Sequence, residues 1–161
     1  MKTRRIALMA MCIALAMILS YVESQIPSPG VSGVKLGLAN IVVIFALYKL
    51  GWKEAVGISL LRVVLVSLLF GHMASFSYSI AGAALSLAGM ILLKRIDKLS
   101  CVAVSVLGGV LHNLGQILVA VAIMGRNVVY YLPGLILSGT IAGVAIGEVS
   151  ALLVHRVDLK A

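Results

Sequence analysis

The stretch Lys35-Leu36-Gly37-Leu38-Ala39-Asn40 opens a long apolar run. It follows a segment punctuated by proline and glycine, Pro27-Ser28-Pro29-Gly30-Val31-Ser32-Gly33. A cation and an amide therefore stand at the entrance of a segment that is otherwise suited to hydrocarbon. Such groups are costly in a bilayer unless they have a partner, so we expect them to mark a binding site rather than simple packing.

The composition of the whole chain is that of an integral membrane protein. Hydrophobic residues make up 62% of the 161 positions and charged residues only 11%, whereas soluble domains carry about a quarter charged residues. The net charge of +8 therefore indicates membrane topology rather than nucleic-acid binding, because basic residues in membrane proteins gather on the cytoplasmic side.

Hydropathy predicts an all-α bundle of six transmembrane helices that forms a single domain over residues 1–161. A membrane-spanning helix needs about 20 apolar residues, and six segments reach or approach that length: 6–22, 36–50, 53–70, 74–93, 99–124 and 133–154. The second is short, so we expect it to be tilted or partly re-entrant. The first resembles a signal peptide but lacks a small-residue cleavage site, so we expect it to be retained.

Basic residues predict that both termini are cytoplasmic. With the N-terminus inside, the outer side holds only Lys35 and Arg126. The inner side then holds ten basic residues: Lys2, Arg4, Arg5, Lys49, Lys53, Lys94, Arg95, Lys98, Arg156 and Lys160. This asymmetry is the positive-inside pattern.

Polar residues inside the predicted spans lie mainly in their outer halves: Asn40, Tyr78, His112, Asn113 and Gln116. His112 and Gln116 are four residues apart and share a helix face, and Asn113 is three residues from Gln116. These side chains could simply bond neighbouring helices together. Three on one turn, at the depth of Asn40 and Tyr78, favour a ligand pocket that opens to the outside.

Two basic residues belong to the same prediction. Lys35 either contacts the ligand or extends to the outer headgroups. Arg62 lies near the middle of a span and needs a carboxylate, carbonyls or an anionic ligand. Glu148 is the acidic residue that lies well inside a span, so an Arg62–Glu148 pair is one interpretation and direct contact with a ligand is the other. With His112, these groups favour a ligand that is anionic or rich in acceptors. A cationic ligand fits poorly, since Glu23 is the sole carboxylate near the outer mouth.

Small residues repeat on two predicted helices. Ala10 and Ala14, with Ala7, form a stripe on the first, and Gly139, Gly143 and Gly147 recur every four residues on the last. Such faces let helices approach closely. We expect the glycines to pack within the bundle, and packing is also an open interpretation for the alanines.

These features together resemble the substrate-binding S components of energy-coupling-factor (ECF) transporters of bacteria. The resemblance rests on Ala10-x-x-x-Ala14, the Pro/Gly-rich first outer loop, the 35–40 block and His112-Asn113-x-x-Gln116. More specifically, the chain resembles the group labelled heptaprenyl diphosphate synthase component I, or Gx transporter family. The resemblance implies a plasma-membrane protein that captures a vitamin-like solute under a lid, here residues 23–35.

The resemblance also implies partners. Ala10 and Ala14 would dock on a transmembrane scaffold subunit that works with two ATPase subunits. A flavin, a thiamin-like compound or a quinone- or isoprenoid-related compound would suit the predicted pocket. No cofactor or metal is expected.

Two enzyme activities are not expected of this chain. It has no Walker A sequence, so ATP hydrolysis would come from partner subunits. Prenyl-chain elongation needs magnesium held by clustered carboxylates, whereas Asp97 and Asp158 are isolated. The alternatives to a transport subunit are an accessory membrane subunit of a prenyl diphosphate synthase and a small structural or channel protein.

Overall fold

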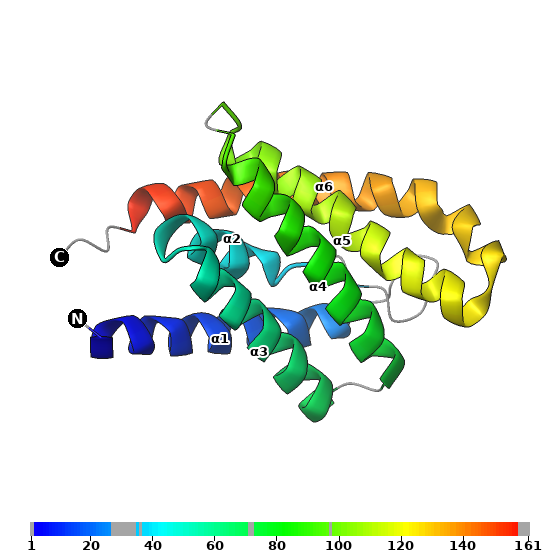
Figure 1. The fold of residues 1–161 in the computed structure, drawn as a ribbon, viewed down its shortest axis with the longest axis horizontal. Coiled ribbons are helices and arrows are strands. Elements are labelled where there is room, and N and C mark those ends of the chain that lie inside the picture. The colour runs from blue at the N-terminus through cyan, green and yellow to red at the C-terminus, as the bar shows by residue number, and fades with distance from the viewer. Residues whose placement is uncertain (1, 27–34, 36, 71–72, 97, 158–161) are drawn as a thin grey trace.

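The computed structural model describes residues 2–26, 35, 37–70, 73–96 and 98–157, and every regular element in them is helical. In chain order the elements are α1 (Lys2–Ser24), α2 (Asn40–Lys49), α3 (Trp52–Phe70), α4 (Met73–Lys94), α5 (Cys101–Met124), the 3-10 helix η1 (Arg126–Tyr131) and α6 (Leu132–Arg156). The first turn of α1 and the last turn of α6 lie at the same end of the bundle (Figure 1). The predicted all-helical class is confirmed.

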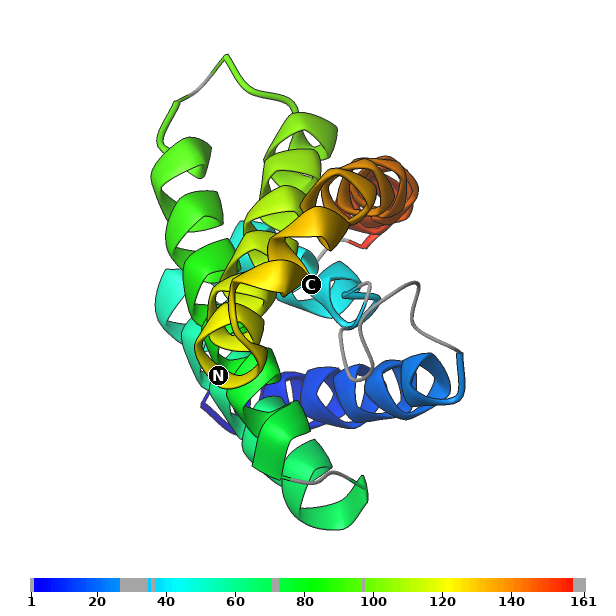
Figure 2. The same ribbon diagram turned by 90° about the vertical axis from the view of Figure 1, so that its right-hand side faces the viewer.

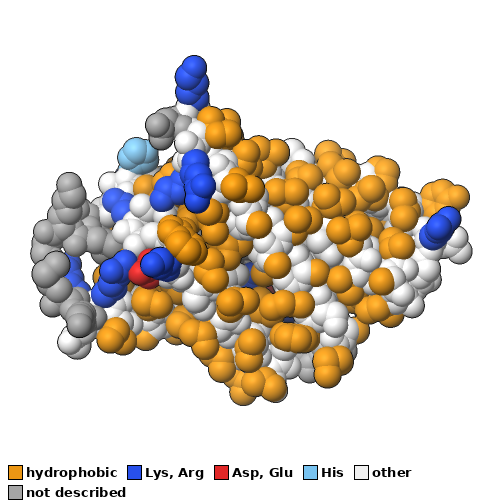
Figure 3. Space-filling view, in the orientation of Figure 1, with side chains coloured by type: hydrophobic (Ala, Val, Ile, Leu, Met, Phe, Trp, Pro, Cys, Tyr) orange, Lys and Arg blue, Asp and Glu red, His pale blue; other side chains and the backbone are white. Residues whose placement is uncertain are grey.

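Four helical stretches of the described chain are long and apolar enough to cross a membrane: Thr3–Ser24, Met73–Lys94, Cys101–Met124 and Arg126–Arg156. The 19 residues of α3 include Lys53, Glu54 and Arg62, and α2 has 10 residues, about 15 Å of helix. Hydrophobic side chains cover the middle of the surface and basic ones gather near the end with the termini (Figure 3). Membrane association follows, whereas the count of six spans and the side of the termini stay predictions.

The short helix α2 lies inside the bundle. Six of its ten residues are buried: Asn40, Val42, Val43, Ile44, Ala46 and Leu47. Helices α1 and α6 both pack on α2 rather than on each other (Figure 2). An element packed on several sides is mostly apolar all round, which is why the sequence of α2 resembles a membrane span although the helix has only 10 residues.

The predicted start of this second helix, at residue 36, was wrong. The helix begins at Asn40, because Gly37 has φ +91° and its carbonyl accepts the Asn40 N–H at 2.8 Å in a turn. A positive φ is readily adopted by glycine and interrupts a helix. Residues 37–39 thus form a turn that leads into α2 rather than an extra helical turn.

Glycines join α5 to α6 and to α4 with almost no side chain between the backbones. A Cβ atom added at Gly109 would lie 2.5 Å from the Gly139 carbonyl oxygen, and one at Gly143 would lie 2.6 Å from the Val106 Cα. On the other side of α5, a Cβ atom at Gly115 would lie 2.6 Å from the Ala81 carbonyl oxygen. The α6 glycines therefore pack within the bundle, as predicted.

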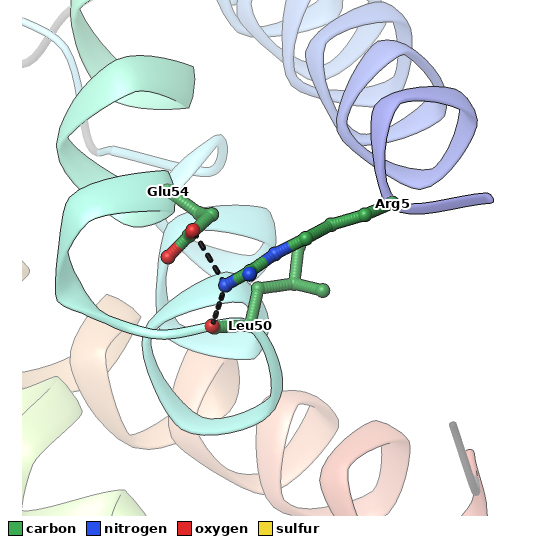
Figure 4. A network of polar contacts seen from close by, with 3 residues as sticks. All are labelled: Arg5, Leu50 and Glu54. Carbon is green, nitrogen blue, oxygen red and sulfur yellow. Dashed lines mark hydrogen bonds and ion pairs between the residues drawn. The ribbon is translucent and has the colours of Figure 1, made fainter. Parts of the chain in front are cut away.

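A polar contact ties three helices together at the end that carries the termini. Arg5 of α1 forms an ion pair with Glu54 of α3 at 2.6 Å and donates to the Leu50 carbonyl, just after α2, at 3.1 Å (Figure 4). Because α2 ends there, the guanidinium satisfies one of the carbonyls left free at a helix terminus.

Candidate functional site

The C-terminal end of α1 presents a buried carboxylate to the segment before α2. Glu23 is 4% exposed, and its Oε1 accepts the backbone N–H groups of Gly37 and Leu38. The Glu23 Oε2 atom is enclosed and has no hydrogen-bond partner among the described residues. Glu23 was absent from the predicted site residues, although it fastens the predicted binding segment to α1.

A second clamp on this segment comes from α5. The Gln116 side chain accepts the Lys35 backbone N–H at 2.8 Å and donates to the Lys35 carbonyl at 2.8 Å. Gln116 is fully buried, and its two bonds join positions 81 residues apart in the sequence. The side chain of Gln116, which was predicted to contact a ligand, is thus hydrogen-bonded to the backbone of Lys35 in this structure.

Arg62 of α3 lies buried beside the same end of α1. Its Nη1 donates to the Ser20 hydroxyl at 3.1 Å, while its Nε and Nη2 are enclosed without hydrogen-bond partners among the described residues. The guanidinium interacts electrostatically with Glu23. The hypothesis that Arg62 pairs with Glu148 was wrong, because Glu148 is exposed on α6 and α1 supplies the neighbours of Arg62.

His112 connects α5 to α4 and to the covering segment. The ring is 2% exposed and is hydrogen-bonded to the Gly82 backbone. A Cβ atom added at Gly37 would lie 3.5 Å from the ring and 3.2 Å from the Asn40 side-chain nitrogen. The His112 Nδ1 has no hydrogen-bond partner among the described residues. The glycines at 37 and 82 therefore leave the space that the imidazole fills.

Asn113 faces α6 instead of the segment before α2. Its amide nitrogen donates to the Leu135 carbonyl at 2.6 Å and lies 3.5 Å from the Ser138 hydroxyl. Its oxygen accepts from Gln116 at 3.4 Å. The bonding that the sequence left open as an alternative, between neighbouring helices, is what the structure shows for Asn113.

Tyr78 is buried in an apolar cluster with Ile117, Val128 and Leu135. Its hydroxyl has no hydrogen-bond partner among the described residues. The ring packing alone would suit a core residue, and the hydroxyl is the part of Tyr78 that is still available to a ligand.

Lys35 completes the charged set. It is partly buried, and burial lowers the pKa of its ammonium, an effect that Glu23 opposes and Arg62 reinforces. Both cations also act electrostatically on His112. We call Ser20, Glu23, Lys35, Arg62, His112 and Gln116 the polar cluster. Of the predicted site residues it unites Lys35, Arg62, His112 and Gln116, with Asn40 at its edge and Asn113 and Tyr78 to one side.

Residues 27–34 of the predicted lid lie outside the described residues, so the lid stays a prediction. Next to it, the described residues 37 and 38 donate their backbone N–H groups to Glu23. Within the described chain, no group of three or more histidine, cysteine and acidic residues is arranged to hold a metal ion.

The predicted docking face lies on the outside of α1. Ala10 and Ala14 are exposed, whereas Cys12 and Ala16 on the opposite side are buried. Beside this face, α1, α2 and the end of α6 line an open apolar pocket of about 210 Å³ that includes Met11, Phe45 and Leu153. The described residues that line this pocket offer no group that would recognise a polar solute.

Comparison with protein families identifies the chain over most of its length. A family model described as heptaprenyl diphosphate synthase component I matches residues 12–153. The chain belongs to this family. All six residues of the polar cluster lie within the matched part of this chain. Searches of curated proteins and of solved structures found no match.

The family description bears on the two main interpretations of the sequence. It confirms the narrower resemblance and implies a protein partner, because a component I is named with respect to another component. It agrees better with the accessory-subunit alternative than with vitamin uptake. The relation to ECF S components stays a prediction.

Proposed function

We propose that this chain is a membrane-embedded binding subunit that holds a small organic anion in the polar cluster and acts together with a protein partner. The observation that carries the proposal is Arg62. It is a cation that is 4% exposed, and two of its three guanidinium nitrogens have no partner among the described residues. A buried charge without its hydrogen bonds costs several kcal/mol, so we expect Arg62 to have a partner beyond the described residues, and a bound ligand would supply it.

The charges around Arg62 support an anion rather than a cation. Lys35 and Arg62 are two positive groups against the one carboxylate of Glu23, and Glu23 already accepts two backbone N–H groups. His112 adds a neutral group that can donate or accept a hydrogen bond. The abundant apolar side chains of the surrounding helices suit a ligand with an aromatic or isoprenoid body.

Two finer versions of this function differ in the partner. The family description favours an accessory membrane subunit of a prenyl diphosphate synthase, which would hold a prenyl diphosphate for a catalytic partner. The resemblance to ECF S components favours an uptake subunit that binds a flavin, a thiamin-like or a quinone-related compound. Its partners would be a transmembrane scaffold and two ATPase subunits, with Ala10 and Ala14 at the contact. In both versions, the chain itself is not the enzyme.

The shared part of the proposal is tested by ligand-dependent thermal unfolding of the detergent-solubilised chain. Farnesyl diphosphate, riboflavin 5′-phosphate and thiamin monophosphate are compared in the unaltered chain and in Arg62→Gln. At least one anion should raise the midpoint of unfolding in the unaltered chain, and Arg62→Gln should remove that rise. Stabilisation that persists in Arg62→Gln would contradict the proposed site.

The partner is tested separately. In the accessory-subunit version, adding the chain in vesicles to a soluble prenyl diphosphate synthase should change product length or yield. In the uptake version, the bound probe should accumulate in cells only with ATP and an intact Ala10–Ala14 face. A probe that binds but shows neither behaviour would refute both finer versions and leave the binding function.

A further inference from the structure

The polar cluster contains two opposite charges that are buried together without forming an ion pair. Glu23 and Arg62 are each 4% exposed, and each acts electrostatically on the other. Among the described residues, the ion pair with nitrogen and oxygen within 4.0 Å is that of Arg5 and Glu54. The Glu23 and Arg62 charges are therefore close enough to interact but too far apart to satisfy each other.

Both groups keep hydrogen-bonding atoms unused. Glu23 Oε2 can accept, and Arg62 Nε and Nη2 can donate, but none of the three has a partner among the described residues. Leaving a buried donor or acceptor unpaired is costly, and more so when it is charged. A single anion would satisfy Arg62 and leave Glu23 Oε2 unpaired, with like charges side by side.

Ser20 connects the two groups through α1. Arg62 Nη1 donates to the hydroxyl of Ser20 at 3.1 Å, and Ser20 precedes Glu23 by three residues on α1, so that both lie on one face of the helix. Glu23 and Arg62 therefore belong to the same end of α1. One small group that reaches both is favoured over a long molecule charged at its two ends.

We infer that the ligand carries a hydrogen-bond donor close to an anionic group, and that this amphoteric group bridges Glu23 to Arg62. An α-amino acid or an α-hydroxy acid has this arrangement. The inference rests on the proposed function and narrows its ligand class. It also gives Glu23 a role in binding. The carboxylate, expected from the sequence only to disfavour cationic ligands, would recognise the hydrogen-bond donor of the ligand.

The ligand reaches this position by way of the covering segment. Glu23 Oε1 holds the backbone of Gly37 and Leu38, and the unused atoms of Glu23 and Arg62 are enclosed by protein. Some of the protein that encloses Oε2 must therefore move aside before a donor can reach it.

The experiment uses three probes with one indole body and the full detergent-solubilised chain. L-tryptophan carries an ammonium and a carboxylate, indole-3-propionate lacks the ammonium, and tryptamine lacks the carboxylate. Their dissociation constants are obtained from the rise in unfolding midpoint with probe concentration. We expect L-tryptophan to bind at least about tenfold more tightly than either analogue, the factor that follows from about 1.4 kcal/mol for one charge-assisted hydrogen bond.

Variants then assign the preference to residues. Glu23→Gln should weaken L-tryptophan about tenfold and leave indole-3-propionate within about twofold, whereas Arg62→Gln should abolish binding of both acids. Glu148→Gln, which alters an exposed carboxylate on α6, is the matched control and should change nothing. The comparison of probes in the unaltered chain keeps the proposal falsifiable if Glu23→Gln fails to fold.

Two results would overturn the bridging ligand. Equal binding of L-tryptophan and indole-3-propionate would show that Glu23 does not take part, while an anion would still bind at Arg62 and the proposed function would stand. Binding of farnesyl diphosphate without binding of any indole probe would likewise reject the bridge and keep the proposed function. Failure of every anion to bind would reject both.

Discussion

Replacing Gln116 by leucine should release the segment that covers Glu23. The substitution removes two hydrogen bonds of 2.8 Å to the backbone of Lys35. Each buried group left without a partner costs about 1–3 kcal/mol, and Lys35 is only partly buried. We therefore expect opening of this segment to become easier by about 2–3 kcal/mol in total, toward the lower end of the range for two groups.

A buried cysteine reports this opening. Cys12 and Cys101 are first replaced by alanine, and Ser20→Cys is introduced three residues before Glu23, which bonds the segment; Ser20 is 1% exposed. When opening and closing are fast relative to alkylation, the labelling rate follows the population of the open state. A loss of about 2–3 kcal/mol corresponds to a labelling rate roughly 30- to 150-fold higher in Gln116→Leu.

The control separates local opening from loss of the whole fold. Ser86→Cys, fully buried between α4 and α5, should label at the same rate with and without Gln116→Leu. An equal rise at both positions would mean general unfolding. An unchanged rate at Ser20→Cys would show that Gln116 does not hold the segment in place and would refute the clamp.

Three further predictions concern the rest of the bundle. Gly143→Ala places a Cβ atom 2.6 Å from the α5 backbone and should destabilise the fold by about 1–3 kcal/mol, whereas Gly134→Ala, with open space around it, should not lower the midpoint of thermal unfolding. Ala10→Leu with Ala14→Leu should leave that midpoint and anion binding unchanged but abolish partner association in co-purification, since both alanines are exposed; loss of binding as well would argue against a docking face. Arg5→Gln should cost at most about 1 kcal/mol in denaturant unfolding, because its side chain is 56% exposed and exposed ion pairs contribute little; a larger loss would show that Arg5 is essential to the fold.

Hydropathy predicted the helices well where burial in hydrocarbon decides the sequence. The bounds of α3, α4 and α5 differ from the predicted segments by at most two residues at each end. The start of α2 differed by four residues because the φ angle of Gly37, rather than hydropathy, determines it. The interior of α2 could not be distinguished from a membrane span, since a helix buried in protein and one buried in lipid are equally apolar.

The sequence indicated several of the residues that lie together in the polar cluster, but not their hydrogen-bond partners. His112 and Gln116 share a helix face as the spacing indicated, but the partner of Gln116 is the backbone of Lys35, and a backbone partner leaves no trace in sequence. Glu23 was considered only as the sole carboxylate near the outer mouth, as an argument against a cationic ligand, and not as a site residue. Its signal was the three-residue spacing from Ser20, which gives α1 a polar end on the face that otherwise holds Cys12 and Ala16.

The glycine contacts of α5 have a consequence for how the protein can move. Where Gly109 meets Gly139 and Gly115 meets Ala81, main chain touches main chain, and there is no flexible side chain to take up a displacement. Sliding of α5 past α4 or past α6 would therefore require the two backbones to separate. Admission of a solute is then left to the other half of the molecule, where α1 and residues 37–39 can shift relative to a rigid unit of α4, α5 and α6.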